Sequence, residues 1–322
     1  MSFMSTPRPP FERRDVPLPA SISPEARAFI SRPTRPAVYP PLDDRKAWRG
    51  LVERANAEAL ASMAKVESWA AKVEHRQIAG VSVYVATPPQ LKTTAVAVYL
   101  HSGGMVLMGG DVVRLSTKIE ATRLGCVVFG VDFRTAPDHP FPAALEDCVN
   151  AYRAVVSAVP PARTALVGYS GGGNLAAATV LRLKDTGTPL PAAVALISPQ
   201  VDLTESGDSF QTNHGLDPAL GHGTAEFNAL YAGSTSLEHP YLSPLFGDLT
   251  GFPPTYLQSG TRDLFLSNTV RMHRALLRAG AEAELHIWEA MHHTGFGPAA
   301  PETEEARLAL CRFLYGRWAD FQ

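Results

Sequence analysis

The chain has 322 residues, of which 45% are apolar and 19% charged, and its formal net charge is −2. This size and composition are typical of a globular protein with one large domain or two smaller ones. The balanced charge excludes the basic surface of a protein that binds nucleic acid or anionic membranes. No apolar run approaches the roughly 20 residues that span a bilayer.

The first residues contain prolines and charges in place of the apolar core of a signal peptide. We therefore expect a cytoplasmic protein whose three cysteines, Cys126, Cys148 and Cys311, stay reduced in the core. Residues 1–42 are rich in proline, with one short helix expected around 24–32. Apolar residues at helical spacing then predict a long helix over 43–70, which contains Trp48 and Trp69.

From residue 72 onward, short β-rich runs alternate with helical stretches. We expect strands at 81–86, 95–101, 126–133, 164–170, 192–198, 254–260 and 283–288. The helices between them are expected near 111–124, 142–158, 171–185, 268–280 and 302–318. This alternation predicts an α/β fold with a mostly parallel central sheet and helices on both faces.

The interval 202–250 breaks this rhythm and contains the short helical run AEFNALYA. An interval of that length between strands often has a function of its own. We interpret 1–71 as a first cap segment and 202–250 as a second one that packs on the N-terminal helix. The catalytic domain then consists of 72–201 and 251–322.

The stretch Gly168-Tyr169-Ser170-Gly171-Gly172 follows a predicted strand and opens a predicted helix. This is the context of a G-x-S-x-G nucleophile elbow, in which a serine on a tight turn needs very small neighbours two positions away on each side. A phosphate-binding loop would require Lys and Ser/Thr after the last glycine, and a dinucleotide site would require G-x-G-x-x-G. Neither pattern fits, so Ser170 is the candidate nucleophile.

Another glycine pair, Gly103-Gly104, follows the apolar strand that ends at His101. Backbone N–H groups there can donate to a substrate oxygen, as can the N–H of Gly171 after the nucleophile. We expect these three glycines to form an oxyanion hole. Ser102 and Met105 flank the pair and, with Tyr169 beside the nucleophile, are candidate substrate-binding residues.

The candidate acid and base lie further along the chain, in the order that α/β hydrolases use. Asp263 follows the strand predicted at 254–260, and His292 and His293 follow the strand at 283–288. The carboxyl ends of parallel strands share one edge of a sheet, so these side chains can converge with Ser170. Adjacent histidines could also bind metal, but no HExxH motif or carboxylate cluster accompanies them, and we expect no metal.

Several of these stretches resemble the hormone-sensitive-lipase-like family, also called the bacterial family IV esterases. The similarity rests on HSGGM at 101–105, DFRTAPDHPFPAALED at 132–147, GYSGGG at 168–173, SGTRDLF at 259–265 and AMHH at 290–293. It implies an α/β-hydrolase fold with a helical cap. It also implies Ser170 as nucleophile, Asp263 as the orienting acid and His293 as base, with His292 as the other candidate.

The chain departs from the family pattern at three positions near Ser170. Ser102 stands in place of a glycine, Tyr169 in place of Asp or Thr, and Gly171 in place of the usual Ala. We expect Ser102 to reshape the oxyanion loop, Tyr169 to alter the pocket wall and Gly171 to open space beside the nucleophile.

These observations predict a serine carboxylesterase that cleaves short to medium acyl esters through an acyl-enzyme, without cofactor. Lactones and activated amides are alternatives, because the same residues cleave them. A different alternative to an enzyme is a non-catalytic small-molecule receptor with the same fold. The expected partner is a small-molecule ester, and a homodimer formed through the last strand and helix is common in similar proteins.

Overall fold

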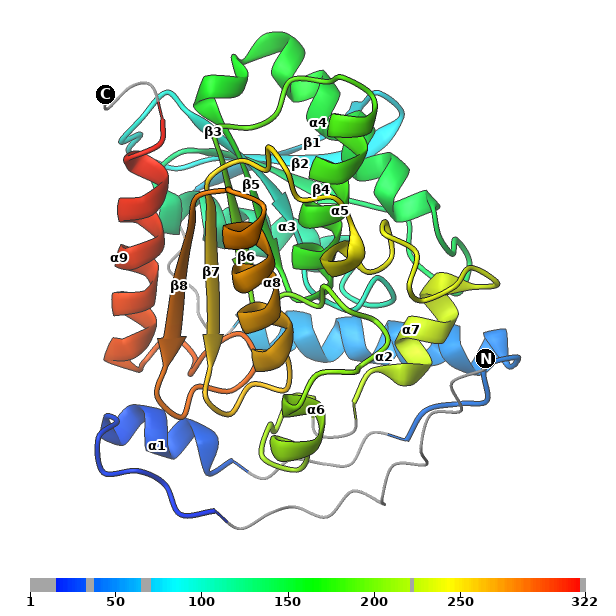
Figure 1. Cartoon of the computed structure of the whole chain (residues 1–322), viewed down its shortest axis with the longest axis vertical. Helices are drawn as coiled ribbons and strands as arrows, with labels where there is room; N and C mark the ends of the chain where they lie inside the picture. The colour runs from blue at the N-terminus through cyan, green and yellow to red at the C-terminus, as the bar shows by residue number, and fades with distance from the viewer. Residues whose placement is uncertain (1–15, 33–37, 65–70, 221–222, 319–322) are drawn as a thin grey trace.

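A computed structural model describes residues 16–32, 38–64, 71–220 and 223–318 of the chain (Figure 1). An eight-stranded sheet in the order β1-β2-β4-β3-β5-β6-β7-β8 forms its centre. The strands are β1 (Lys72–Ile78), β2 (Val81–Thr87), β3 (Val96–Leu100), β4 (Val127–Asp132), β5 (Thr164–Tyr169), β6 (Ala193–Ile197), β7 (Thr255–Gly260) and β8 (Ala283–Trp288). The pairs that β2 forms with β1 and β4 are antiparallel, and the other five pairs are parallel. The predicted mostly parallel sheet is therefore confirmed.

Helices precede the sheet, connect its strands and follow it. They are α1 (Pro24–Ile30), α2 (Arg45–Ala64), α3 (Asp111–Leu124), α4 (Ala143–Ala158), α5 (Gly171–Asp185), α6 (Ser209–Thr212), α7 (Ala225–Ala232), α8 (Leu266–Arg278) and α9 (Pro301–Tyr315). Two short 3-10 helices cover Pro161–Arg163 and Pro244–Phe246.

Two apolar layers hold the sheet, one on each face. In β3, Val98 and Leu100 point into the layer shared with α4, α5 and α8. Ala97 and Tyr99 alternate with them and point into the layer shared with α3 and α9. Because both sets of side chains are buried, β3 has the continuous apolar sequence expected of a covered parallel strand.

The first strand, β1, was not among the seven strands expected from the sequence. Its sequence KVEHRQI is polar and most of its side chains are exposed. It lies at the edge of the sheet and pairs only with β2. Besides this backbone pairing, Val73 and Ile78 pack partly on the two apolar layers, but no apolar pattern in the sequence marks the strand.

The segments that flank the strands' carboxyl ends are α1, α2, α6 and α7, at the end of the molecule toward which β7 and β8 point (Figure 1). Trp48 of α2 is fully buried, with its ring 5.8 Å from that of Phe227 of α7. The 202–250 interval thus contacts the N-terminal helix α2 through Phe227. Trp69 and the rest of the helix expected to residue 70 lie outside the described residues. Within those residues, no helix is long and apolar enough to cross a membrane.

Candidate active site

Ser170 lies on the turn between β5 and α5, with φ 57° and ψ −118°. Residues other than glycine rarely adopt a positive φ, and such strain concentrates at functional sites. The surrounding backbone is so close that a Cβ on Gly172 would lie 2.1 Å from the carbonyl oxygen of Leu100, and one on Gly168 would lie 2.2 Å from that of Gly172. The expected need for very small residues on both sides of Ser170 is confirmed.

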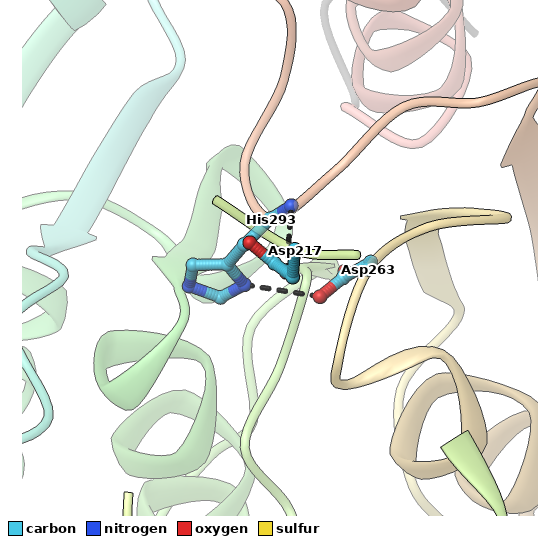
Figure 2. Close-up of side chains that lie close together, drawn as sticks. All are labelled: Asp217, Asp263 and His293. Carbon is cyan, nitrogen blue, oxygen red and sulfur yellow. Dashed lines mark hydrogen bonds and ion pairs between the residues drawn. The ribbon is translucent and has the colours of Figure 1, made fainter. Parts of the chain in front are cut away.

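Asp263 and His293 meet at the carboxyl edge of the sheet, where the loops after β7 and β8 come together (Figure 2). The His293 Nδ1 atom lies 3.1 Å from Asp263 Oδ1, and both side chains are buried. Because a carboxylate only accepts, Nδ1 carries a proton, and in the neutral ring the Nε2 lone pair is available to accept another. The 30-residue spacing between the two positions therefore does bring them into contact.

Further donors surround the Asp263 carboxylate. The Ser259 hydroxyl donates to Oδ2 at 2.7 Å and the Phe265 N–H to Oδ1 at 2.9 Å. Burial alone would raise the pKa of Asp263, but the charge and hydrogen bond of His293, with hydrogen bonds from Ser198 and Phe265, outweigh it and hold the pKa below its ordinary value. The carboxylate is therefore ionised at neutral pH and able to orient His293.

The loop that carries His293 also reaches back toward the nucleophile turn. The Thr294 N–H donates to the Ser198 hydroxyl oxygen at 3.1 Å, directly after β6. The Ser170 N–H donates to the carbonyl oxygen of Ile197 at 2.9 Å. Ser170 and the His293 loop thus contact consecutive residues at the end of one strand.

His292 has different surroundings. Its ring stacks on Phe29 of α1 at a centroid distance of 5.3 Å, and its Nδ1 lies 3.1 Å from the carbonyl oxygen of His293. Burial lowers the pKa of His292 and keeps the ring neutral. Of the two histidines, His293 is the one whose ring is hydrogen-bonded to Asp263.

The two glycine motifs also meet. The backbone N of Gly104 lies 2.9 Å from the point that a Cβ on Gly171 would occupy. Gly103 and Gly104 have φ values of 114° and 60°, which residues with a side chain rarely adopt. The ring of Phe227 in α7 lies directly over Gly104. The peptide groups of this loop and the N-terminus of α5 can therefore face one oxygen atom.

Comparisons with known proteins agree with this geometry. A family model described as alpha/beta hydrolase fold matches residues 97–296. An acetyl-hydrolase from Streptomyces hygroscopicus is 36% identical over 67% of this chain and 74% of its own length. The crystal structure of an esterase E25 covers 95% of this chain and 98% of that protein, with a TM-score of 0.89 and 33% identity.

A further crystal structure, of an esterase from the bacterial hormone-sensitive lipase family, covers 92% of this chain and 98% of that protein, with a TM-score of 0.76 and 31% identity. The chain belongs to the hormone-sensitive-lipase-like esterases of the α/β-hydrolase fold. It is thus a carboxylic ester hydrolase, as its sequence motifs predict.

The departures from the family pattern have local explanations in this esterase, and one expectation about them was wrong. Gly171 does not open space beside the nucleophile, because the Met105 sulfur lies 2.6 Å from where a Cβ on Gly171 would be. Tyr169 packs against Tyr99 in the layer shared with α3 and α9, and its hydroxyl donates to Glu120 Oε2 at 3.3 Å. Its predicted role at the pocket wall and with substrate stays a prediction.

Ser102 is half-buried in the oxyanion loop of the esterase. Its carbonyl oxygen accepts a hydrogen bond from His101 Nδ1 at 2.6 Å, and the His101 ring stacks on Phe133 with 4.0 Å between centroids. A buried imidazole therefore fixes the start of this loop. The predicted role of Ser102 with substrate stays a prediction.

Sequence reasoning missed one buried residue of the site, Asp217, whose carboxylate lies beside Asp263 and His293 (Figure 2). It lies between α6 and α7, and no motif marks it. Two carboxylates and a histidine are residue types that can hold a metal ion. Here, however, every carboxylate oxygen already accepts a protein N–H or O–H group, which is an environment suited to anions and not to a cation.

Proposed function

We propose that this esterase cleaves short- to medium-chain acyl esters through a covalent acyl-enzyme on Ser170, with His293 as general base and Asp263 as the acid that orients it. The observation that carries the proposal is the contact of the Ser170 turn and the His293 loop with consecutive residues Ile197 and Ser198. The buried Asp263–His293 hydrogen bond supports the assignment of His293 over His292.

The mechanism follows from the proton positions. His293 Nε2 takes the Ser170 hydroxyl proton as the oxygen attacks the ester carbonyl, and Asp263 stabilises the resulting imidazolium. The N–H groups of Gly103, Gly104 and Gly171 bind the oxyanion. His293 then protonates the departing alcohol and activates a water molecule, which releases the acid and regenerates Ser170.

We propose further that 1–71 and 202–250 form the cap over this site and limit the acyl chain that it accepts. The packing of Trp48 in α2 against Phe227 in α7, with Phe227 over Gly104, supports this. One relative is named an acetyl-hydrolase, and an acetyl group is a short acyl group, which supports this limit on chain length. Buried free thiols at Cys126, Cys148 and Cys311 agree with a cytoplasmic enzyme.

The decisive experiment measures hydrolysis of p-nitrophenyl esters of graded chain length. Ser170→Ala should lower turnover by on the order of 10⁶-fold, as loss of a triad nucleophile does. His293→Ala should have a comparable effect, while His292→Ala, the matched control, should leave most activity because its ring lies against Phe29. Retained activity in Ser170→Ala would refute the mechanism, and the reverse order of the two histidines would reassign the base.

A further inference from the structure

We propose that Asp217, a buried carboxylate of the 202–250 segment, is a positioning residue that holds the His293 loop against Asp263 and places a second negative charge beside the imidazolium formed during catalysis. The inference rests on the proposed function, in which His293 is the base. It assigns part of the catalytic environment to the proposed cap segment.

Asp217 is bound by four backbone N–H groups from three separate segments. Its Oδ2 accepts from Leu264 at 3.0 Å and from His293 itself at 3.2 Å. Its Oδ1 accepts from Ala219 at 2.8 Å and from Leu220 at 3.2 Å, within its own loop. One carboxylate therefore joins the cap segment to the residue after Asp263 and to the backbone of the base.

The position of Asp217 also gives it an electrostatic effect on the base. Nitrogen and oxygen atoms of His293, Asp263 and Asp217 lie within 4.8 Å of one another, and the exposed fractions of these side chains are 6%, 0% and 1%. Charges interact strongly in such a dry environment. The other groups around the His293 ring are the neutral His292 and the edge-on ring of Phe265.

The charge state of Asp217 results from opposing influences. Burial and the neighbouring Asp263 raise the pKa of Asp217 above its ordinary value, and the nearby His293 and the N–H donors offset only part of this rise. Four N–H groups directed at two oxygens leave no acceptor for a carboxylic O–H, so the hydrogen bonds suit the ionised form. An ionised Asp217 stabilises a protonated histidine at this distance.

The test is the pH profile of ester hydrolysis by the full chain carrying Asp217→Asn. Removing the charge makes the protonated histidine less stable. The acidic midpoint of the kcat/KM profile should therefore move to lower pH by about 1 unit, and kcat should fall about 10-fold. KM should change little, because Asp217 lies behind the base. Structural loosening alone would lower kcat without moving the midpoint.

Asn213→Ala is the matched control. Asn213 belongs to the same segment and donates to the carbonyl oxygens of Thr261 at 3.1 Å and Asp263 at 2.8 Å, so its loss loosens the same loop without altering any charge. It should lower the melting temperature and leave the acidic midpoint in place. Asp217→Glu, which keeps the charge in a poorer position, should also keep the midpoint and remains informative if Asp217→Asn does not fold.

Three outcomes overturn the proposal: an unmoved midpoint in Asp217→Asn, an equal shift in Asn213→Ala, or a shifted midpoint in Asp217→Glu. Each of these leaves the triad assignment intact as long as Ser170→Ala is inactive. An active Ser170→Ala enzyme would instead refute the proposed function on which the role of Asp217 rests. The two failures are therefore distinguishable.

Discussion

At the residue scale, one buried histidine outside the proposed triad makes stability depend on pH. His101 begins the oxyanion loop, is 2% exposed and has no hydrogen-bond partner at Nε2 among the described residues. Burial lowers its pKa to about 4, against small opposing effects of the Ser102 carbonyl and Asp132. The unfolded chain, in which histidine titrates near its ordinary value of about 6.5, therefore binds more protons below neutrality.

We expect this histidine to contribute stability that is present above about pH 6.5 and is lost as the pH falls toward 4. The difference corresponds to about 3 kcal/mol of unfolding free energy. Urea unfolding of the wild type and His101→Gln at pH 7 and pH 4.5 measures it. The variant should lose less stability over this range, and equal losses would show that His101 does not cause the pH dependence.

At the element scale, one fully buried tryptophan anchors α2. Trp48 is fully buried between Tyr39 and Phe227, and its Nε1 donates to the carbonyl oxygen of Pro41 at 3.0 Å. Trp48→Ala should cost about 3–5 kcal/mol, since it leaves a large cavity. It should also lower kcat/KM, because Phe227 then loses the support that keeps it over Gly104.

Arg49→Ala on the same helix is the control for this experiment. Arg49 forms an ion pair with Asp138 at 2.6 Å, but its side chain is 57% exposed, so its loss should change stability much less than the loss of Trp48. Melting curves and esterase assays of both variants compare the two contacts. If Trp48→Ala is as stable and as active as Arg49→Ala, the burial of Trp48 does not hold α2 on the catalytic domain.

The elements that could be predicted from the sequence are those with a pattern visible in a short stretch of residues. Strands such as β3 and helices such as α3 and α5 have local patterns of apolar residues, and the G-x-S-x-G turn has a steric requirement visible in five residues. The polar edge strand β1 and the four-residue α6 have no such pattern. Asp217 and the Met105–Gly171 contact arise only from packing between distant segments, so no local signal could reveal them.

At the scale of the whole molecule, the N-terminal region contacts the carboxyl end of the sheet in two places. Whereas α2 packs beside the oxyanion loop, α1 packs on the loop that carries His293 and on the start of α9. Ser23 ahead of α1 binds the Glu302 carboxylate through its N–H at 2.7 Å and its hydroxyl at 2.8 Å. The homodimer predicted through the last strand and helix would use the open edge of β8, which pairs only with β7, together with α9. It stays a prediction.

Removal of residues 1–37 tests the contribution of α1 separately from that of α2. The truncation exposes the apolar patch that Ile22, Ala26 and Ile30 cover, and each buried isoleucine is worth about 1.5–3 kcal/mol. We expect the melting temperature to fall by on the order of 10 °C. Turnover should fall as well, because Met291 and Phe296 on either side of His293 lose their packing against α1. A truncated enzyme with wild-type melting temperature and kcat would show that the His293 loop keeps its geometry without α1.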